Sequence, residues 1–255
     1  MRYKNTKVLK MVRIVLLPLV FLSAIGFVGK QQNGKIITKI DIDIDNHYDS
    51  YFIDENDIMN MITENGNKKL IGTPFSQLNL KEIEVNVSQH KFVQNAEVYK
   101  DLQGTLVVNV EQSVPIARVV QTDGPDAYIS DRGHVLPVSE KFTARVIVVG
   151  GEYTPELVKK DLPLDSASFK IFDLLQYIEK DKFWKTQIAQ LDIDKTGDIT
   201  LYPQVGKQII EFGKAEDVHE KFNKLNIFYK QILPQKGWNA YERVNLKFKN
   251  QIVCE

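Results

Sequence analysis

The sequence predicts an α+β protein with a transmembrane helix near its N-terminus, a small domain of two helices and three strands, and a second domain with an antiparallel-rich sheet flanked by helices. Three observations predict this fold. An apolar run covers residues 14–29, two helix-start signatures lie between strand patterns in residues 35–113, and short strand patterns separated by turns fill residues 114–255. The 255 residues, 43% apolar and 26% charged, suffice for an anchor and two globular domains.

The first predicted element is a transmembrane helix that follows a basic tail. Residues 1–13 contain Arg and Lys but no Asp or Glu, so the positive-inside rule places them in the cytoplasm and the body outside it. The apolar run has roughly 16 residues and is shorter than the usual span of ~20. A cleaved signal peptide is the alternative, for which Ser23–Gly26 is a poor cleavage site. The predicted anchor residues are Ile14, Leu16, Leu17, Leu19, Val20, Phe21, Leu22 and Phe27.

The next predicted elements form a βααββ unit. In residues 36–45, Ile40, Ile42 and Ile44 alternate with charged residues, as expected of a half-buried strand. Asp54 with Asp57, and Asn79 with Glu82, have the spacing of N-terminal helix caps. Residues 92–100 and 105–112 are predicted as a hairpin of two strands. Such a unit is large enough for one sheet covered on one face by two helices.

These residues resemble a known family. The run Ile40-Asp41-Ile42, the segment FVQNAEV at residues 92–98 and the segment TLVVNVEQSVPIA at residues 105–117 are similar to the POTRA module of the bacterial FtsQ/DivIB family. The sequence departs from the family pattern at Gln112, where Arg is common. The resemblance implies a POTRA-like domain at residues 35–113 and an FtsQ-type β domain at residues 114–255.

The second domain is predicted from turns and amphipathic patterns. Strands are expected near residues 127–130, 145–149, 191–194, 199–202 and 207–212, with a turn at Asp131–His134. A helix is expected to start near Ser166. A longer one is expected from Ala215 to Leu233, with a core stripe at steps of three and four and Pro234 as its end.

The last element is predicted as one long strand from Tyr241 to Ile252, with Phe248 among its inward residues. It is either a paired strand kept soluble by its cations or an open edge to which an extended partner segment adds. The resemblance favours the second alternative, because it implies that an FtsB-like partner binds a C-terminal edge strand. The candidate partner-binding residues on the polar face are Tyr241, Arg243, Asn245, Lys247, Lys249 and Gln251.

No pattern for catalysis, a cofactor or a metal emerges. Asp41–Asp45 and Asp192–Gly197 resemble calcium loops but lack the acidic twelfth residue, and the four histidines have no metal-ligand spacing. The single cysteine, Cys254, permits no internal disulfide. Beyond the basic tail the chain is acidic in balance, which argues against nucleic-acid binding. No catalytic residue, cofactor or small-molecule substrate is therefore expected.

The resemblance implies a non-enzymatic scaffold of the division machinery. Such a protein is single-pass in the bacterial cytoplasmic (inner) membrane, with its body periplasmic or extracytoplasmic. It joins division proteins at the septum, including FtsB-like and FtsL-like single-pass partners, and helps to control septal cell-wall synthesis. Two other classes stay open: a POTRA-containing envelope protein of transport or assembly, and a membrane-anchored envelope enzyme.

Overall fold

The computed structural model describes residue 16 and residues 35–45, 51–159 and 167–255. Apart from Leu16, the predicted anchor residues lie outside this part of the chain, as does Ser166. No helix among the described residues is long and apolar enough to cross a membrane. The described residues divide into two compact units: residues 35–45 with 53–112, and residues 51–52 with 113–159 and 167–255. We call them the first and the second unit.

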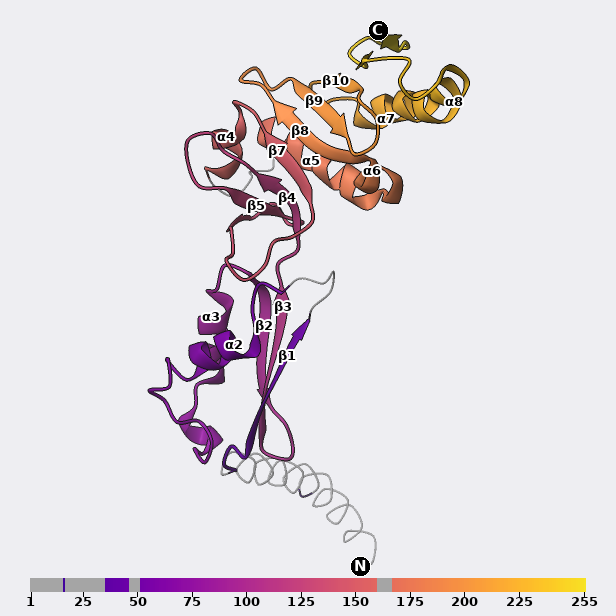
Figure 1. The fold of residues 1–255 in the computed structure, drawn as a ribbon. Coiled ribbons are helices and arrows are strands. Elements are labelled where there is room, and N and C mark those ends of the chain that lie inside the picture. Colours follow the sequence, from indigo (N-terminus) through magenta and orange to yellow (C-terminus); the bar gives the residue numbers. More distant parts are fainter. Residues whose placement is uncertain (1–15, 17–34, 46–50, 160–166) are drawn as a thin grey trace, which may run out of the picture. The chain divides into compact units, whose positions relative to one another are not determined.

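The first unit has a three-stranded sheet in the order β1-β3-β2, with two helices on one face (Figure 1). Strand β1 runs parallel to β3, and β2 is antiparallel to β3. This arrangement confirms the predicted βααββ unit and the hairpin of its last two strands. The elements are β1 (Lys39–Asp45), α2 (Glu55–Ile62), a 3-10 turn η2 (Phe75–Gln77), α3 (Leu80–Ser88), β2 (Val93–Lys100) and β3 (Thr105–Gln112).

Local caps set the starts of both helices in this unit. The Asp57 N–H donates to the Asp54 carboxylate at 2.9 Å and the Asp54 N–H donates to Asp57 at 3.0 Å, which is the predicted capping box. The Asn79 side chain accepts from the Glu82 N–H at 3.2 Å. The helices bury Ile58, Ile62, Ile83 and Val87.

The second unit has a nine-stranded mixed sheet in the order β12-β11-β10-β9-β8-β7-β4-β5-β6. Five of its eight strand pairs are antiparallel, so it matches the predicted α+β class with an antiparallel-rich sheet. The strands are β4 (Pro115–Val119), β5 (Ala127–Ser130), β6 (Val135–Pro137), β7 (Ile147–Gly150), β8 (Ile188–Ile193), β9 (Ile199–Pro203), β10 (Ile209–Gly213), β11 (Arg243–Asn245) and β12 (Val253–Cys254).

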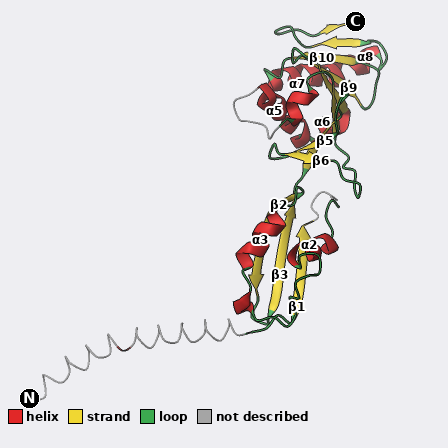
Figure 2. Cartoon of the chain, turned by 90° about the vertical axis from the view of Figure 1, so that its left-hand side faces the viewer, coloured by secondary structure: helices red, strands yellow, loops and turns green. Residues whose placement is uncertain are grey.

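Helices pack on this sheet and enclose one continuous core (Figure 2). They are α4 (Thr154–Val158), α5 (Ala167–Lys180), α6 (Lys182–Gln187), α7 (Val218–Ile227) and α8 (Leu233–Lys236), with a π-helical turn η3 (Phe228–Ile232) between the last two. Phe222 and Leu225 of α7 lie in one core cluster with Leu201, Ile210 and Val244 of the sheet. The predicted apolar stripe of the long helix is therefore core.

The predicted end of the long helix at Pro234 is wrong. The helical segment continues through α8 to Lys236 and ends at Gly237, whose φ is +99°. The wider turn η3 interrupts the regular α-helical hydrogen bonds before Pro234, and proline lies in the first turn of α8, where its missing N–H costs little. Gly237 then adopts a positive φ with an extended ψ of 147°, a conformation open to glycine, and the helix ends.

Candidate interaction surface

The predicted strand from Tyr241 to Ile252 is wrong in length. Only Arg243–Asn245 form β11, after which the chain leaves the sheet and returns as the antiparallel strand β12. The Asn245 side chain accepts from the Lys247 N–H at 3.0 Å, so it competes for a backbone donor that a longer strand would use. Lys224 on α7 donates to the Phe248 carbonyl at 2.8 Å and holds the loop in place.

In the predicted strand from Tyr241 to Ile252, the alternation of buried and exposed side chains holds only as far as Leu246. Val244 and Leu246 are fully buried, as expected, but Phe248 is 47% exposed instead of packing inward. Tyr241, expected on the polar face, is partly buried and its ring lies 6.1 Å from that of Phe228. Lys249 and Gln251 are exposed and lie in the loop between β11 and β12. The six candidate residues therefore do not share one strand face.

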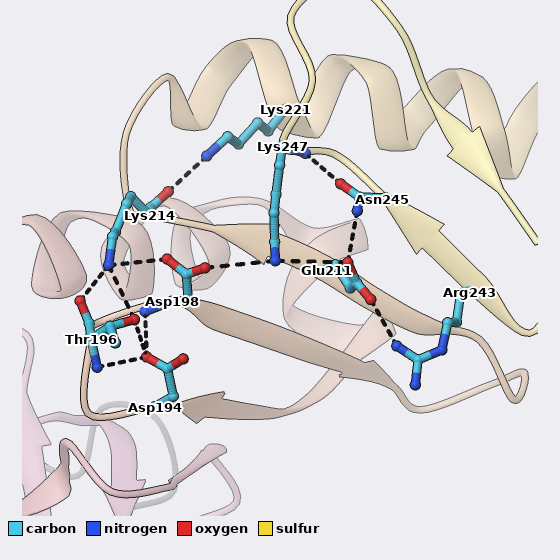
Figure 3. A network of polar contacts seen from close by, with 9 residues as sticks. All are labelled: Asp194, Thr196, Asp198, Glu211, Lys214, Lys221, Arg243, Asn245 and Lys247. Carbon is cyan, nitrogen blue, oxygen red and sulfur yellow. Dashed lines mark hydrogen bonds and ion pairs between the residues drawn. The ribbon is translucent and has the colours of Figure 1, made fainter.

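Three of the candidate residues converge on Glu211 of β10 (Figure 3). Arg243 Nη1 lies 2.7 Å from Glu211 Oε1, and Asn245 Nδ2 donates to Glu211 Oε2 at 2.7 Å. Lys247 Nζ lies 3.7 Å from Glu211 Oε2. The parallel register places Glu211 opposite Asn245. The charges of Arg243 and Lys247 are therefore neutralised by a carboxylate of the neighbouring strand.

A second carboxylate, that of Asp198, extends this group across the turn before β9. Lys247 Nζ lies 3.6 Å from Asp198 Oδ2, and Lys214 Nζ lies 3.0 Å from Asp198 Oδ1. The turn is built on Asp194, which accepts from the Thr196 hydroxyl at 2.7 Å and from the Asp198 N–H at 2.9 Å. These hydrogen bonds, led by the Thr196 hydroxyl, lower the pKa of Asp194. We give the name Glu211 network to the residues labelled in Figure 3, which are Asp194, Thr196, Asp198, Glu211, Lys214, Lys221, Arg243, Asn245 and Lys247.

Lys221 on α7 supports the network from the core side. Its side chain is 9% exposed, its Nζ donates to the Lys214 carbonyl at 2.7 Å, and the same atom lies 4.7 Å from the centre of the Phe212 ring. Burial lowers the pKa of Lys221. The network therefore holds the short strand β11 against β10. Its carboxylates form ion pairs with cations of the same network.

The outer edge of the described sheet at this end is β12 and not β11. The N–H groups of Arg243 and Glu255 exchange hydrogen bonds with each other's carbonyls at 3.1 and 3.0 Å. Cys254, paired opposite Val244, is the next residue along β12. In an antiparallel ladder such a residue turns its N–H and C=O away from the partner strand. The backbone of Cys254 therefore faces outward, beside a partly buried thiol whose pKa burial raises.

Sequence reasoning placed the edge on the wrong strand and missed Glu211, Asp198 and Cys254. Glu211 stands between the apolar residues Ile210 and Phe212, and this alternation marks it as facing away from the core. Nothing in the sequence shows that β11 lies beside it, because the parallel pairing depends on the crossover through α7 and α8. Among the described residues, no group of three or more His, Cys, Asp or Glu side chains is arranged to hold a metal ion.

Comparison with known proteins places this fold in a family. A family model described as "FtsQ/DivIB, C-terminal related" matches residues 114–255. A second model, described as "POTRA-like domain", matches residues 35–111. The cell division protein FtsQ of Syntrophotalea carbinolica is 25% identical over 177 residues, which cover 69% of this chain and 62% of that protein. FtsQ of Salinibacter ruber is 26% identical over 182 residues, which cover 66% of each chain.

The chain thus spans less than two thirds of the length of these relatives, 62% of the first and 66% of the second. The match to the C-terminal family covers more than half of the chain and contains all nine strands of the second unit's sheet. The POTRA-like match covers the described residues of the first unit apart from Gln112. The chain belongs to the FtsQ/DivIB family.

Proposed function

We propose that the protein is a membrane-anchored scaffold of the bacterial division machinery, which holds other division proteins at the septum and helps to control septal cell-wall synthesis. The observation that carries this proposal is the outward-facing backbone of β12 at the end of the sheet. Family membership and relatives that bear the name cell division protein FtsQ support the cellular setting.

The edge of β12 supports binding by strand addition. A partner segment in extended form reaches the N–H and C=O of Cys254 and continues the sheet beyond β12. Its contribution per backbone hydrogen bond is about 1 kcal/mol, so neighbouring side chains supply the rest of the affinity. The Glu211 network contributes to this binding indirectly. It holds β11 in register with β10, and β12 in turn pairs with β11.

The proposed partners are FtsB-like and FtsL-like single-pass proteins. The proposed anchor, residues 14–29, places the body outside the bacterial cytoplasmic membrane, with the N-terminus in the cytoplasm. Confinement to one membrane raises the effective concentration of partners anchored in it, which makes a short edge strand sufficient for capture. N-terminal sequencing of the mature protein tests the anchor: the chain begins before Ile14, and a start after Gly26 contradicts it.

Replacing Cys254 with proline tests the edge. Proline removes the outward N–H while leaving the inward bonds of Glu255 to Arg243 in place. We expect Cys254→Pro to weaken binding of the extracytoplasmic part of the FtsB-like partner by about tenfold, measured by titration with the purified fragment. Cys254→Ala, which keeps the N–H, is the matched control and retains binding.

The same variants separate binding from folding. The urea midpoint of Cys254→Pro is expected to stay close to that of Cys254→Ala. Unchanged partner binding by a folded Cys254→Pro variant contradicts capture at this edge. A fluorescent fusion of the full chain gathers at midcell if the division role is right, and an even distribution along the membrane opposes that role.

A further inference from the structure

A second exposed surface of the second unit combines aromatic and aliphatic side chains. Phe183 on α6, Val205 between β9 and β10, and Trp238 after α8 are 42%, 59% and 50% exposed. We call these three residues the aromatic patch. Large apolar side chains that gather at the surface from separate segments mark binding sites, and Trp is the residue type most enriched among those that dominate binding energy.

Two residues of the patch, Phe183 and Trp238, lie next to the buried ring of Tyr229. The ring centres of Phe183 and Trp238 lie 6.1 and 6.3 Å from that of Tyr229. Gln187 on α6 donates to the Val205 carbonyl at 3.1 Å, which ties Val205 to the helix that carries Phe183. The patch therefore draws on three segments more than 20 residues apart in the sequence.

The backbone under the patch is held firmly. Gln208, which is 1% exposed, donates to the Trp238 carbonyl. Gly206 has a φ of +107°, and a Cβ there would lie 2.2 Å from the Gln208 side-chain oxygen, so only glycine leaves room for this amide. Trp238 thus has a fixed main-chain position, although its side chain is half exposed.

The segments that form the patch carry lysines and almost no acids. Residues 199–210 and 221–241 contain no Asp or Glu. The two acids just before α6 are already engaged: Asp181 accepts from the Phe183 and Trp184 N–H groups at 2.8 and 3.1 Å, and Glu179 pairs with Lys185. Within the described part of the chain, four exposed lysines of these segments and of α6 form no ion pair: Lys182, Lys207, Lys230 and Lys236.

A cavity whose lining reaches the chain neighbour of Val205 could receive a side chain of a bound segment. It has a volume of about 530 Å³, and its lining combines the apolar residues Ile116, Leu175, Ile178 and Ile188 with the charged residues Arg145, Glu179 and Lys185. It extends to Gln204, the chain neighbour of Val205. An apolar side chain of a protein segment fits such a cavity, whereas a flat lipid surface leaves it unfilled.

We propose that the aromatic patch and this cavity dock an acidic, amphipathic segment of a partner protein. Its apolar side chains pack on Phe183 and Trp238, one of them enters the cavity, and its carboxylates face the unpaired lysines. This contact is made by side chains, so it is separate from strand addition at β12 and extends the proposed scaffold role with a second docking surface.

Photo-crosslinking from position 238 tests the proposal in the full chain, in its own cells. Trp238→p-benzoylphenylalanine is illuminated, and mass spectrometry identifies what is attached and at which residues. Tyr99 of the first unit, 45% exposed, is the matched control position for the same probe. The urea midpoint of Trp238→Ala, expected near that of the parent chain, shows that the site tolerates the change.

We expect a protein adduct whose crosslinked peptide has more Asp and Glu than Lys and Arg. Adding Lys182→Glu and Lys207→Glu together is expected to reduce its yield at least about fivefold. Cys254→Pro leaves the adduct in place, which separates this surface from the β12 edge. A lipid adduct alone, a yield no higher than from position 99, or an adduct insensitive to the charge reversals overturns the proposal.

Discussion

The last two strands of the second unit's sheet, β11 and β12, differ in what their polar groups can still bind. β11 has a strand on each side, and its Arg243 and Asn245 side chains meet Glu211. Among the described residues, β12 has a neighbouring strand on one side only, and the backbone of Cys254 points outward. Charge and alternation thus identify the strand that holds this end of the sheet together, whereas outward-facing backbone groups identify the strand with open hydrogen-bonding positions.

The largest expected effect concerns the side chains that follow β11. Leu246→Ala removes a fully buried side chain and is expected to lower the free energy of unfolding by about 3 kcal/mol, because it leaves a cavity in the core. Phe248→Ala is the matched control, since Phe248 is 47% exposed, and is expected to cost below about 1 kcal/mol. Urea unfolding measures both. Equal losses contradict the end of the strand at Asn245.

A smaller effect is expected at the hub of the network. Glu211→Ala leaves Arg243 and Asn245 without their acceptor and is expected to cost about 1–2 kcal/mol in urea unfolding. Glu220→Ala, which removes an exposed acid 3.5 Å from Lys224, serves as control and is expected to cost below about 0.5 kcal/mol. A Glu211→Ala variant as stable as this control shows that β11 is held by its backbone alone.

The smallest effect is a pH dependence at Lys221. The folded protein lowers the pKa of Lys221 below its ordinary value of 10.5, so the unfolded chain binds the proton more tightly. The cost of burying the charge is fully present below the folded pKa and disappears as the pH rises toward 10.5. Stability relative to Lys221→Met is therefore expected to increase with pH across this window, in urea unfolding at pH 7 and pH 10. A constant difference contradicts the burial of a charged lysine.

Local signals made the first unit predictable. Asp54 and Asp57 lie three residues apart and cap their helix by bonds within one turn, so the sequence contains the whole interaction. The hairpin of β2 and β3 is likewise closed by four residues, and the structure shows it as predicted. Interactions between residues this close in the sequence can be predicted without knowing the rest of the fold.

Distant contacts made the end of the second unit unpredictable. In the sequence, the alternation of apolar and polar residues continues to Phe248. In the structure, the Lys247 N–H donates to the Asn245 side chain and the Phe248 carbonyl accepts from the Lys224 side chain, so neither group pairs with a strand. The pairing of Arg243 with Glu211 spans 32 residues. The aromatic patch depends in the same way on distant contacts, because Phe183 of α6 and Trp238 after α8 meet at Tyr229. The acid-free runs around Val205 and Trp238 were the one signal available for it.

The most direct test of the central claim uses the single cysteine of the sequence, Cys254, in the full chain. Cysteine is placed at successive positions along the segment of the proposed FtsB-like partner that would meet β12, and disulfide formation with Cys254 is measured in cells that hold both full chains. Strand addition at β12 predicts the highest yield at the position opposite Cys254, weaker crosslinks two residues to either side and none at the positions between, because side chains of a strand alternate between faces and a disulfide needs Cα atoms within about 7 Å. A uniform yield, a repeat of three to four residues or no crosslink at any position contradicts it.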